Sequence, residues 1–163
     1  MKAENPNWDT NHLRGPRMTE EIDETKRPLL VEQEGAVTTI TINDAPWNRM
    51  SMEFMDALEA LVDDLSADKS VRAVVITGAG DEHFSVGMHL KQMAGTVSSR
   101  SDMEAVLDQR LRVLDTIENM DKPWIATLYG YCLGGGLELP LACHFRLAAA
   151  EGARIGLPEL DIG

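Results

Sequence analysis

The sequence is poor in cysteine and in basic residues, and it has no long hydrophobic run. Its two cysteines, Cys132 and Cys143, form neither a CxxC pair nor a disulfide framework, which favours a reduced, cytoplasmic protein. Only 15 Lys and Arg residues accompany 27 Asp and Glu residues, and the basic residues form no cluster, so nucleic acid is not an expected partner. No apolar stretch reaches the length of a membrane span or a signal-peptide core, so we expect no membrane association.

What the sequence does contain is enough for one folded domain. A chain of 163 residues, 44% of them hydrophobic, can bury roughly 70% of the surface that it exposes when unfolded. Residues 1–27 hold scattered charge, two prolines and no sustained periodicity, which is typical of a disordered tail. We therefore expect the folded domain in residues 28–163.

The first part of this domain alternates between strand and helix patterns. Residues 29–44 are rich in β-branched side chains and break near Gly35, which predicts a hairpin. Ser51 can cap a helix that follows. The apolar positions of this helix recur at helical spacing: Met55, Leu58, Leu61, Val62 and Leu65. The run VRAVVIT at 71–77 is typical of a strand that is buried on both faces.

The same pattern occurs a second time. The sequence SDME at 101–104 predicts a capping box at the start of another helix. The apolar stripe expected on that helix consists of Leu107, Leu111, Leu114 and Ile117. Pro123 then closes the helix before a strand, WIATL, at 124–128. Because strands and helices alternate, the sequence predicts an α/β fold with a mainly parallel sheet.

Two glycine-bearing stretches follow the buried strands, and neither is a P-loop. Residues 77–87 lack the GxGxxG spacing, and residues 130–138, GYCLGGGLE, lack the Lys-Ser/Thr pair that reaches phosphates. Glycine allows a backbone to lie close to a ligand, and a helix that begins there leaves free N–H groups for an oxyanion. The three glycines could equally form only a tight turn between a strand and a helix.

Three motifs together resemble one family. They are HFSVGMHLKQM at 83–93, GYCLGGGLEL at 130–139 and ARIGLPELDIG at 153–163, preceded by the loop APWNRMS at 45–51. In this order they resemble the crotonase superfamily of enoyl-CoA hydratases and isomerases. The resemblance implies a crotonase-like (ClpP/crotonase) spiral of ββα units with a mainly parallel sheet. It also implies that the core domain, residues 28–163, is incomplete at its C-terminal end.

The resemblance also implies a reaction. The thioester carbonyl of an acyl-CoA would lie between the backbone N–H groups of Met88 and Gly135, which would stabilise an enolate. Glu138 and Glu159 match glutamates that position and deprotonate water and exchange a proton at the α carbon. We therefore expect an enoyl-CoA hydratase, a lyase. The alternatives are an isomerase, a dehydratase or a thioester hydrolase of the same superfamily, or a non-catalytic fragment of the fold.

Further site residues and partners follow from the same resemblance. The residues expected to bind substrate are Pro46, Trp47, Val86, Met88, His89, Leu90, Lys91, Gly134 and Gly135. We expect no cofactor apart from the coenzyme A of the substrate, and no metal, because the histidines lack a recognised ligand spacing. The family forms trimers or dimers of trimers, which implies a homo-oligomer. Two departures from the family are His89, where Asp is common, and Pro140, which requires the helix after the glycines to be short, shifted or bent.

Overall fold

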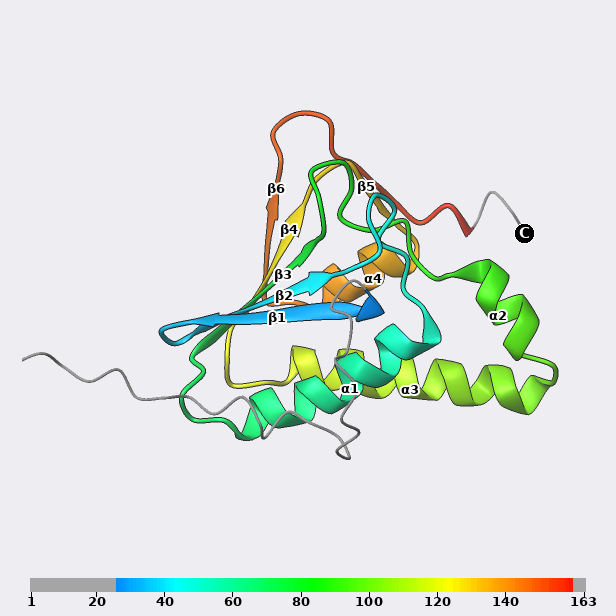
Figure 1. Ribbon diagram of the computed structural model, residues 1–163, viewed down its shortest axis with the longest axis horizontal. Coiled ribbons are helices and arrows are strands. Elements are labelled where there is room, and N and C mark those ends of the chain that lie inside the picture. Colours follow the sequence, from blue (N-terminus) through cyan, green and yellow to red (C-terminus); the bar gives the residue numbers. More distant parts are fainter. Residues whose placement is uncertain (1–25, 160–163) are drawn as a thin grey trace, which may run out of the picture.

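The computed structural model describes residues 26–159, which form a sheet with helices packed along it (Figure 1). The main sheet has five strands in the order β1-β2-β3-β4-β6. These strands are β1 (Leu29–Glu34), β2 (Val37–Ile42), β3 (Ala73–Gly78), β4 (Trp124–Leu128) and β6 (Phe145–Ala148). Only β1 and β2 pair in antiparallel fashion, and each other neighbouring pair is parallel. The predicted α/β fold with a mainly parallel sheet is therefore confirmed.

A second, two-stranded sheet and four helices complete the fold. Strand β5 (Tyr131–Leu133) pairs in parallel with β7 (Arg154–Gly156). The helices are α1 (Met52–Ala67), α2 (Leu90–Thr96), α3 (Arg100–Glu118) and α4 (Gly135–Ala142). Most of the tail expected over residues 1–27 lies outside the described residues. Within the described part, no helix is long and apolar enough to cross a membrane.

The hairpin and the first helix form where the sequence predicts them. Strands β1 and β2 turn at Gly35, which has a φ of 59°. Ser51 caps α1, because its hydroxyl accepts a hydrogen bond of 3.1 Å from the Phe54 amide. All five apolar positions predicted for this helix are buried, so α1 packs its expected face into the core.

The core lies between the sheet and helices α1 and α3, which run side by side along one face of the sheet (Figure 1). Trp124 of β4 and Phe54 of α1 are fully buried there. Strand β3 alternates between buried and half-buried residues, so the prediction that it is buried on both faces is wrong. Val74 and Ile76 face the core, whereas Val75 on the opposite face is only partly covered by the described residues.

Helix α3 starts earlier and presents a different face than the sequence predicts. Ser99 is its N-cap, and the capping box joins Ser99 to Asp102 instead of Ser101 to Glu104. The predicted apolar stripe is also wrong for two of its four members, since Leu107 and Leu111 are exposed. The buried residues of α3 are Arg110, Val113 and Ile117, of which only Ile117 was predicted. These residues are spaced i, i+3, i+7 and therefore share one face of α3, and α3 packs against α1 and α4.

The position of the capping box gives a prediction about stability. We expect Ser99→Ala to lower the free energy of unfolding by about 1 kcal/mol, because it removes the side chain that caps α3. Ser101→Ala is the matched control, and we expect its change to stay within about 0.5 kcal/mol. Urea unfolding of both variants measures the difference. A larger loss for Ser101→Ala than for Ser99→Ala would contradict the observed capping box.

Candidate active site

The site is built on the first turn of α4, where the three consecutive glycines lie. Gly134 is the N-cap and has a φ of 53°, a conformation that favours glycine. Its amide donates a 3.0 Å hydrogen bond to the Gly156 carbonyl, which ties the turn to strand β7. Gly136 has no room for a side chain, because an added Cβ would collide with the backbone carbonyl of Ser85. The glycines therefore let three chain segments meet at the start of one helix.

The loop that contains Met88 lies against this turn. Gly87 has a φ of 94°, and a Cβ added to it would lie 3.1 Å from the Gly135 amide nitrogen. Buried Ser85 fixes the loop, since its hydroxyl donates to the Asn48 carbonyl at 2.6 Å and accepts from the Gly87 amide at 3.1 Å. Within residues 26–159, the amides of Met88 and Gly135 donate no hydrogen bond. The two amides proposed for the thioester oxygen thus belong to adjoining segments.

Both predicted glutamates reach the same turn from different directions. Glu138 belongs to α4 itself, and its amide donates to the Gly134 carbonyl at 3.0 Å. Glu159 follows β7, and its carboxylate lies so close to Gly134 that an added Cβ there would collide with Oε1. The Glu138 side chain is 43% exposed and Glu159 is exposed, so both carboxylates remain accessible to water.

The sequence reasoning missed Arg110, which lies at this turn as well. Its guanidinium Nη2 is 2.5 Å from Oε2 of Glu138, and only 9% of its side chain is exposed. A Cβ added to Gly135 would lie 2.5 Å from the same Nη2 atom. A sequence signal for a buried Arg110 does exist, because Arg110, Val113 and Ile117 are spaced i, i+3, i+7 and can share one face of a helix. The predicted stripe with Leu111 and Leu114 is shifted from this series by one residue.

The residues expected to bind substrate lie along the loops beside this turn. The Val86 amide donates to the Trp47 carbonyl at 3.0 Å, which brings the half-buried Pro46 and exposed Trp47 next to the Met88 loop. The Trp47 ring stacks on His83, with ring centroids 5.1 Å apart. These contacts place the loop of Pro46 and Trp47 against the loop that leads to Met88.

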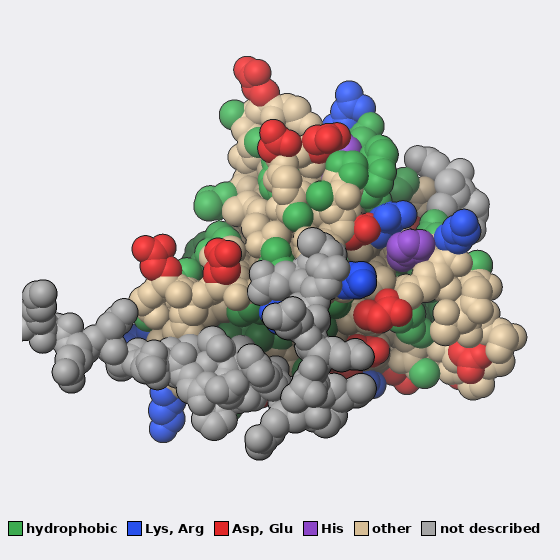
Figure 2. All heavy atoms as spheres, in the orientation of Figure 1, with side chains coloured by type: hydrophobic (Ala, Val, Ile, Leu, Met, Phe, Trp, Pro, Cys, Tyr) green, Lys and Arg blue, Asp and Glu red, His purple; other side chains and the backbone are tan. Residues whose placement is uncertain are grey.

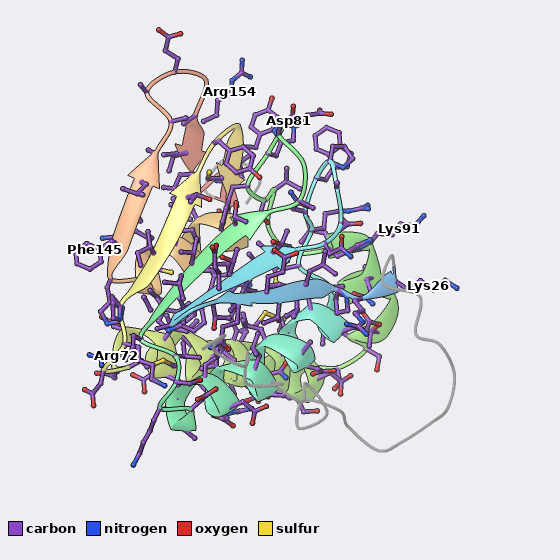
Figure 3. The ribbon with its side chains drawn as sticks, turned by 60° about the vertical axis from the view of Figure 1, so that its left-hand side comes forward. Lys26, Arg72, Asp81, Lys91, Phe145 and Arg154 are labelled. Atoms are coloured by element: carbon purple, nitrogen blue, oxygen red, sulfur yellow. The ribbon has the colours of Figure 1, made fainter. Side chains whose placement is uncertain are left out.

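Helix α2 carries the remaining three of these residues. His89 is its N-cap, and its Nδ1 accepts a hydrogen bond from the Gln92 amide at 3.1 Å. Leu90 and Lys91 are exposed, and Lys91 points away from the body of the protein (Figure 3). The structure therefore brings the segments of Met88, Gly134 and Gly135 together, whereas the Lys91 side chain points away from the body of the protein.

Burial controls the ionisation of the two cysteines, which lie within residues 26–159. Burial raises the pKa of Cys132 to about 11 and that of Cys143 to about 12, so neither is a thiolate near neutral pH. Burial also acts to raise the pKa of Asp44, but hydrogen bonds from Arg49 outweigh it and lower the pKa. Residues 26–159 contain no group of three or more His, Cys, Asp or Glu side chains that could hold a metal. On the visible face, charged side chains of both signs are scattered (Figure 2).

Comparison with known proteins identifies the family. Residues 32–163 match the family model of enoyl-CoA hydratase/isomerase. The chain is 37% identical over 127 residues to a probable enoyl-CoA hydratase of Bacillus subtilis, covering 78% of this chain and 48% of the relative. It is 30% identical over 136 residues to a short-chain-enoyl-CoA hydratase of Clostridium acetobutylicum, covering 83% and 51%.

A solved structure agrees with these sequence matches. The crystal structure of an enoyl-CoA hydratase from Bacillus anthracis superposes with a TM-score of 0.77 at 30% identity, covering 83% of this chain and 52% of that one. The chain belongs to the enoyl-CoA hydratase/isomerase family, and the predicted crotonase fold is confirmed. It spans about half the length of these relatives.

Proposed function

We propose that the protein is an enoyl-CoA hydratase that adds water across the α,β double bond of an enoyl thioester. The observation that supports the proposal is that the first turn of α4 holds two adjoining backbone amides, the Glu159 carboxylate beside Gly134, and the Glu138 carboxylate paired with Arg110 beside Gly135. The amides are those of Met88 and Gly135, and the carboxylates are those of Glu138 and Glu159. Enoyl-CoA hydratases among its relatives support the same reaction class.

The proposed reaction uses both the glutamate side chains and the backbone amides. One glutamate takes a proton from water while the water oxygen forms a bond to the β carbon. The π electrons of the double bond move toward the thioester oxygen, and the enolate that results accepts hydrogen bonds from the Met88 and Gly135 amides. The other glutamate, which is protonated at the start of the step, gives its proton to the α carbon, and the thioester carbonyl re-forms. The proton that the first glutamate took from water then passes through solvent to the second, which resets the pair. The net change is the addition of one water, and the only coenzyme required is the coenzyme A of the substrate.

Loss of the conjugated thioester provides the first test of this proposal. We expect the ultraviolet absorbance of a trans-2-enoyl-CoA to fall when the purified protein is added. A saturated acyl-CoA is the control and should show no change. An absorbance that stays constant over a range of acyl chain lengths would overturn the assignment.

We also propose that the chain associates with copies of itself, because β6 presents an apolar edge. Within the described residues, β6 pairs only with β4, and all four of its residues are exposed. Phe145 is 59% exposed and stands away from the sheet edge (Figure 3), and Leu147 is 63% exposed. An uncovered edge strand with large apolar side chains favours pairing with another chain. Light scattering should give a mass above that of one chain, and a uniform monomer at micromolar concentration would contradict this proposal.

A further inference from the structure

The ion pair between Arg110 and Glu138 links α3 to the first turn of α4. The Nη2 and Oε2 atoms are 2.5 Å apart. Arg110 is nine-tenths buried, and a buried cation requires a nearby anion to offset the loss of its hydration. No other ion pair of Arg110 occurs within residues 26–159, so Glu138 provides this compensation there.

The surroundings of Arg110 hold its guanidinium in place. Apolar side chains surround a cavity of about 10 Å³ next to it, and these are Met50, Met55, Leu58, Val113, Leu114 and Leu139. On the side of α4, the guanidinium lies against Gly135, where an added Cβ would be 2.5 Å from Nη2 and 2.9 Å from Nη1. Arg110 therefore packs closely between the core and the glycine turn, and within residues 26–159 its buried Nε has no hydrogen-bond partner.

The carboxylate of Glu138, in contrast, lies between the buried Arg110 and a groove on the surface. Its Oε2 faces Arg110, while Oε1 makes no hydrogen bond with the described residues. On its open side, a groove of about 600 Å³ runs between α3 and α4 and is lined by Leu111, Leu114 and Leu141 among others. A glutamate with this much exposure would rotate freely between rotamers unless one oxygen were held.

We propose that Arg110 is a positioning residue that holds Oε2 of Glu138 and thereby directs Oε1 toward the reacting water or carbon. The inference rests on the proposed hydratase function, since Glu138 is one of the two glutamates of that reaction. Arg110 does not itself touch the reacting atoms. Its role depends on geometry, and displacement of a catalytic group by about 1 Å can cost roughly a hundredfold in rate.

The test compares Arg110→Met with the matched control Arg112→Met. Arg112 lies on the same helix and forms an exposed ion pair with Glu59 at 3.0 Å. We expect Arg110→Met to lower kcat by about a hundredfold with less than about a threefold change in KM, because only the placement of Glu138 is lost. Arg112→Met should leave both constants unchanged. Equal kinetics for Arg110→Met and the wild-type protein would overturn the proposal.

Two further variants separate positioning from a general effect on folding. Arg110→Lys keeps a charge but not the planar guanidinium, and we expect it to restore part of the lost kcat. In a Glu138→Gln background, Arg110→Met should change kcat by less than about threefold, because a residue that acts only through Glu138 has nothing left to position. If the two effects multiplied instead, Arg110 would act independently of Glu138 and the proposal would be wrong.

A crystal structure distinguishes this proposal from the function on which it rests. A wild-type protein that leaves every enoyl-CoA unchanged would refute the hydratase assignment. Structures of the wild-type protein and of Arg110→Met would test, independently of any activity, whether Arg110 positions the Glu138 carboxylate. We expect the Glu138 carboxylate to move or to adopt several rotamers in Arg110→Met, and an unchanged carboxylate would overturn the role of Arg110.

Discussion

Glu138→Gln and Glu159→Gln are each expected to lower kcat for enoyl-CoA hydration by about 10²- to 10⁴-fold, the usual contribution of a general acid or base. Glutamine keeps the size and a hydrogen-bonding oxygen but cannot take or give the proton. Coenzyme A binding should remain, because neither glutamate is among the residues expected to bind substrate. Steady-state rates and calorimetric binding of coenzyme A measure the two effects separately.

The two variants should differ in stability, which provides an internal check. Glu138→Gln leaves the buried Arg110 without its anion, so its melting temperature should fall, whereas Glu159 is exposed and its replacement should have little effect. Glu151→Gln, in the exposed loop between β6 and β7, is the control for any general effect of lost charge. Wild-type turnover in both Glu138→Gln and Glu159→Gln would rule out the proposed acid–base pair.

Gly135→Ala is the second substitution from which we expect a large effect, with turnover reduced by about a hundredfold. The new Cβ would lie 2.5 Å from Arg110 Nη2 and 3.1 Å from Cζ, so the guanidinium must move. Because that guanidinium pairs with Glu138, the glutamate would move with it. The Gly135 amide itself is retained, so the loss would come from displaced side chains and not from a missing hydrogen-bond donor.

Gly95→Ala is the matched control for this substitution. Gly95 lies in α2, and a Cβ added there has no neighbour within 4 Å. Its kinetics should equal those of the wild-type protein. Met88→Ala provides a contrast within the site, since it retains the amide and should alter the preference for acyl chain length more than the chemistry. A Gly135→Ala protein with wild-type kcat would show that Arg110 and Glu138 tolerate displacement.

The glycine turn could be predicted from the sequence because its signal is local, whereas the roles of Glu138 and Glu159 follow only from the family resemblance. Three consecutive glycines before Glu138 favour either a tight turn or a close backbone approach, and α4 begins there. Pro140 also has a local effect: of the three alternatives, a short, shifted or bent helix, α4 is short, with eight residues. The approach of Glu159 to Gly134 has no such local signal. It depends on the pairing of β5 with β7, and each of these strands has only three residues.

The sequence reasoning missed Arg110 because the rotation of α3 depends on what packs against it. Successive residues on a helix are about 100° apart, so a stripe moved by one position presents another face. The leucines at 107 and 111 formed the stronger pattern in the sequence, but the contacts of α3 with α1 and α4 bury Arg110 and Val113. An arginine on the buried face is favourable only because Glu138 of α4 lies opposite, and that contact is absent from either helix alone.

The mass of the product formed from a trans-2-enoyl-CoA tests the central claim most directly, because loss of absorbance alone does not separate hydration from other reactions. The wild-type protein should yield an intact thioester that has gained the mass of one water, and Glu138→Gln and Glu159→Gln should yield little of it. A product of unchanged mass with a moved double bond, the release of free coenzyme A, or unreacted substrate would contradict the account.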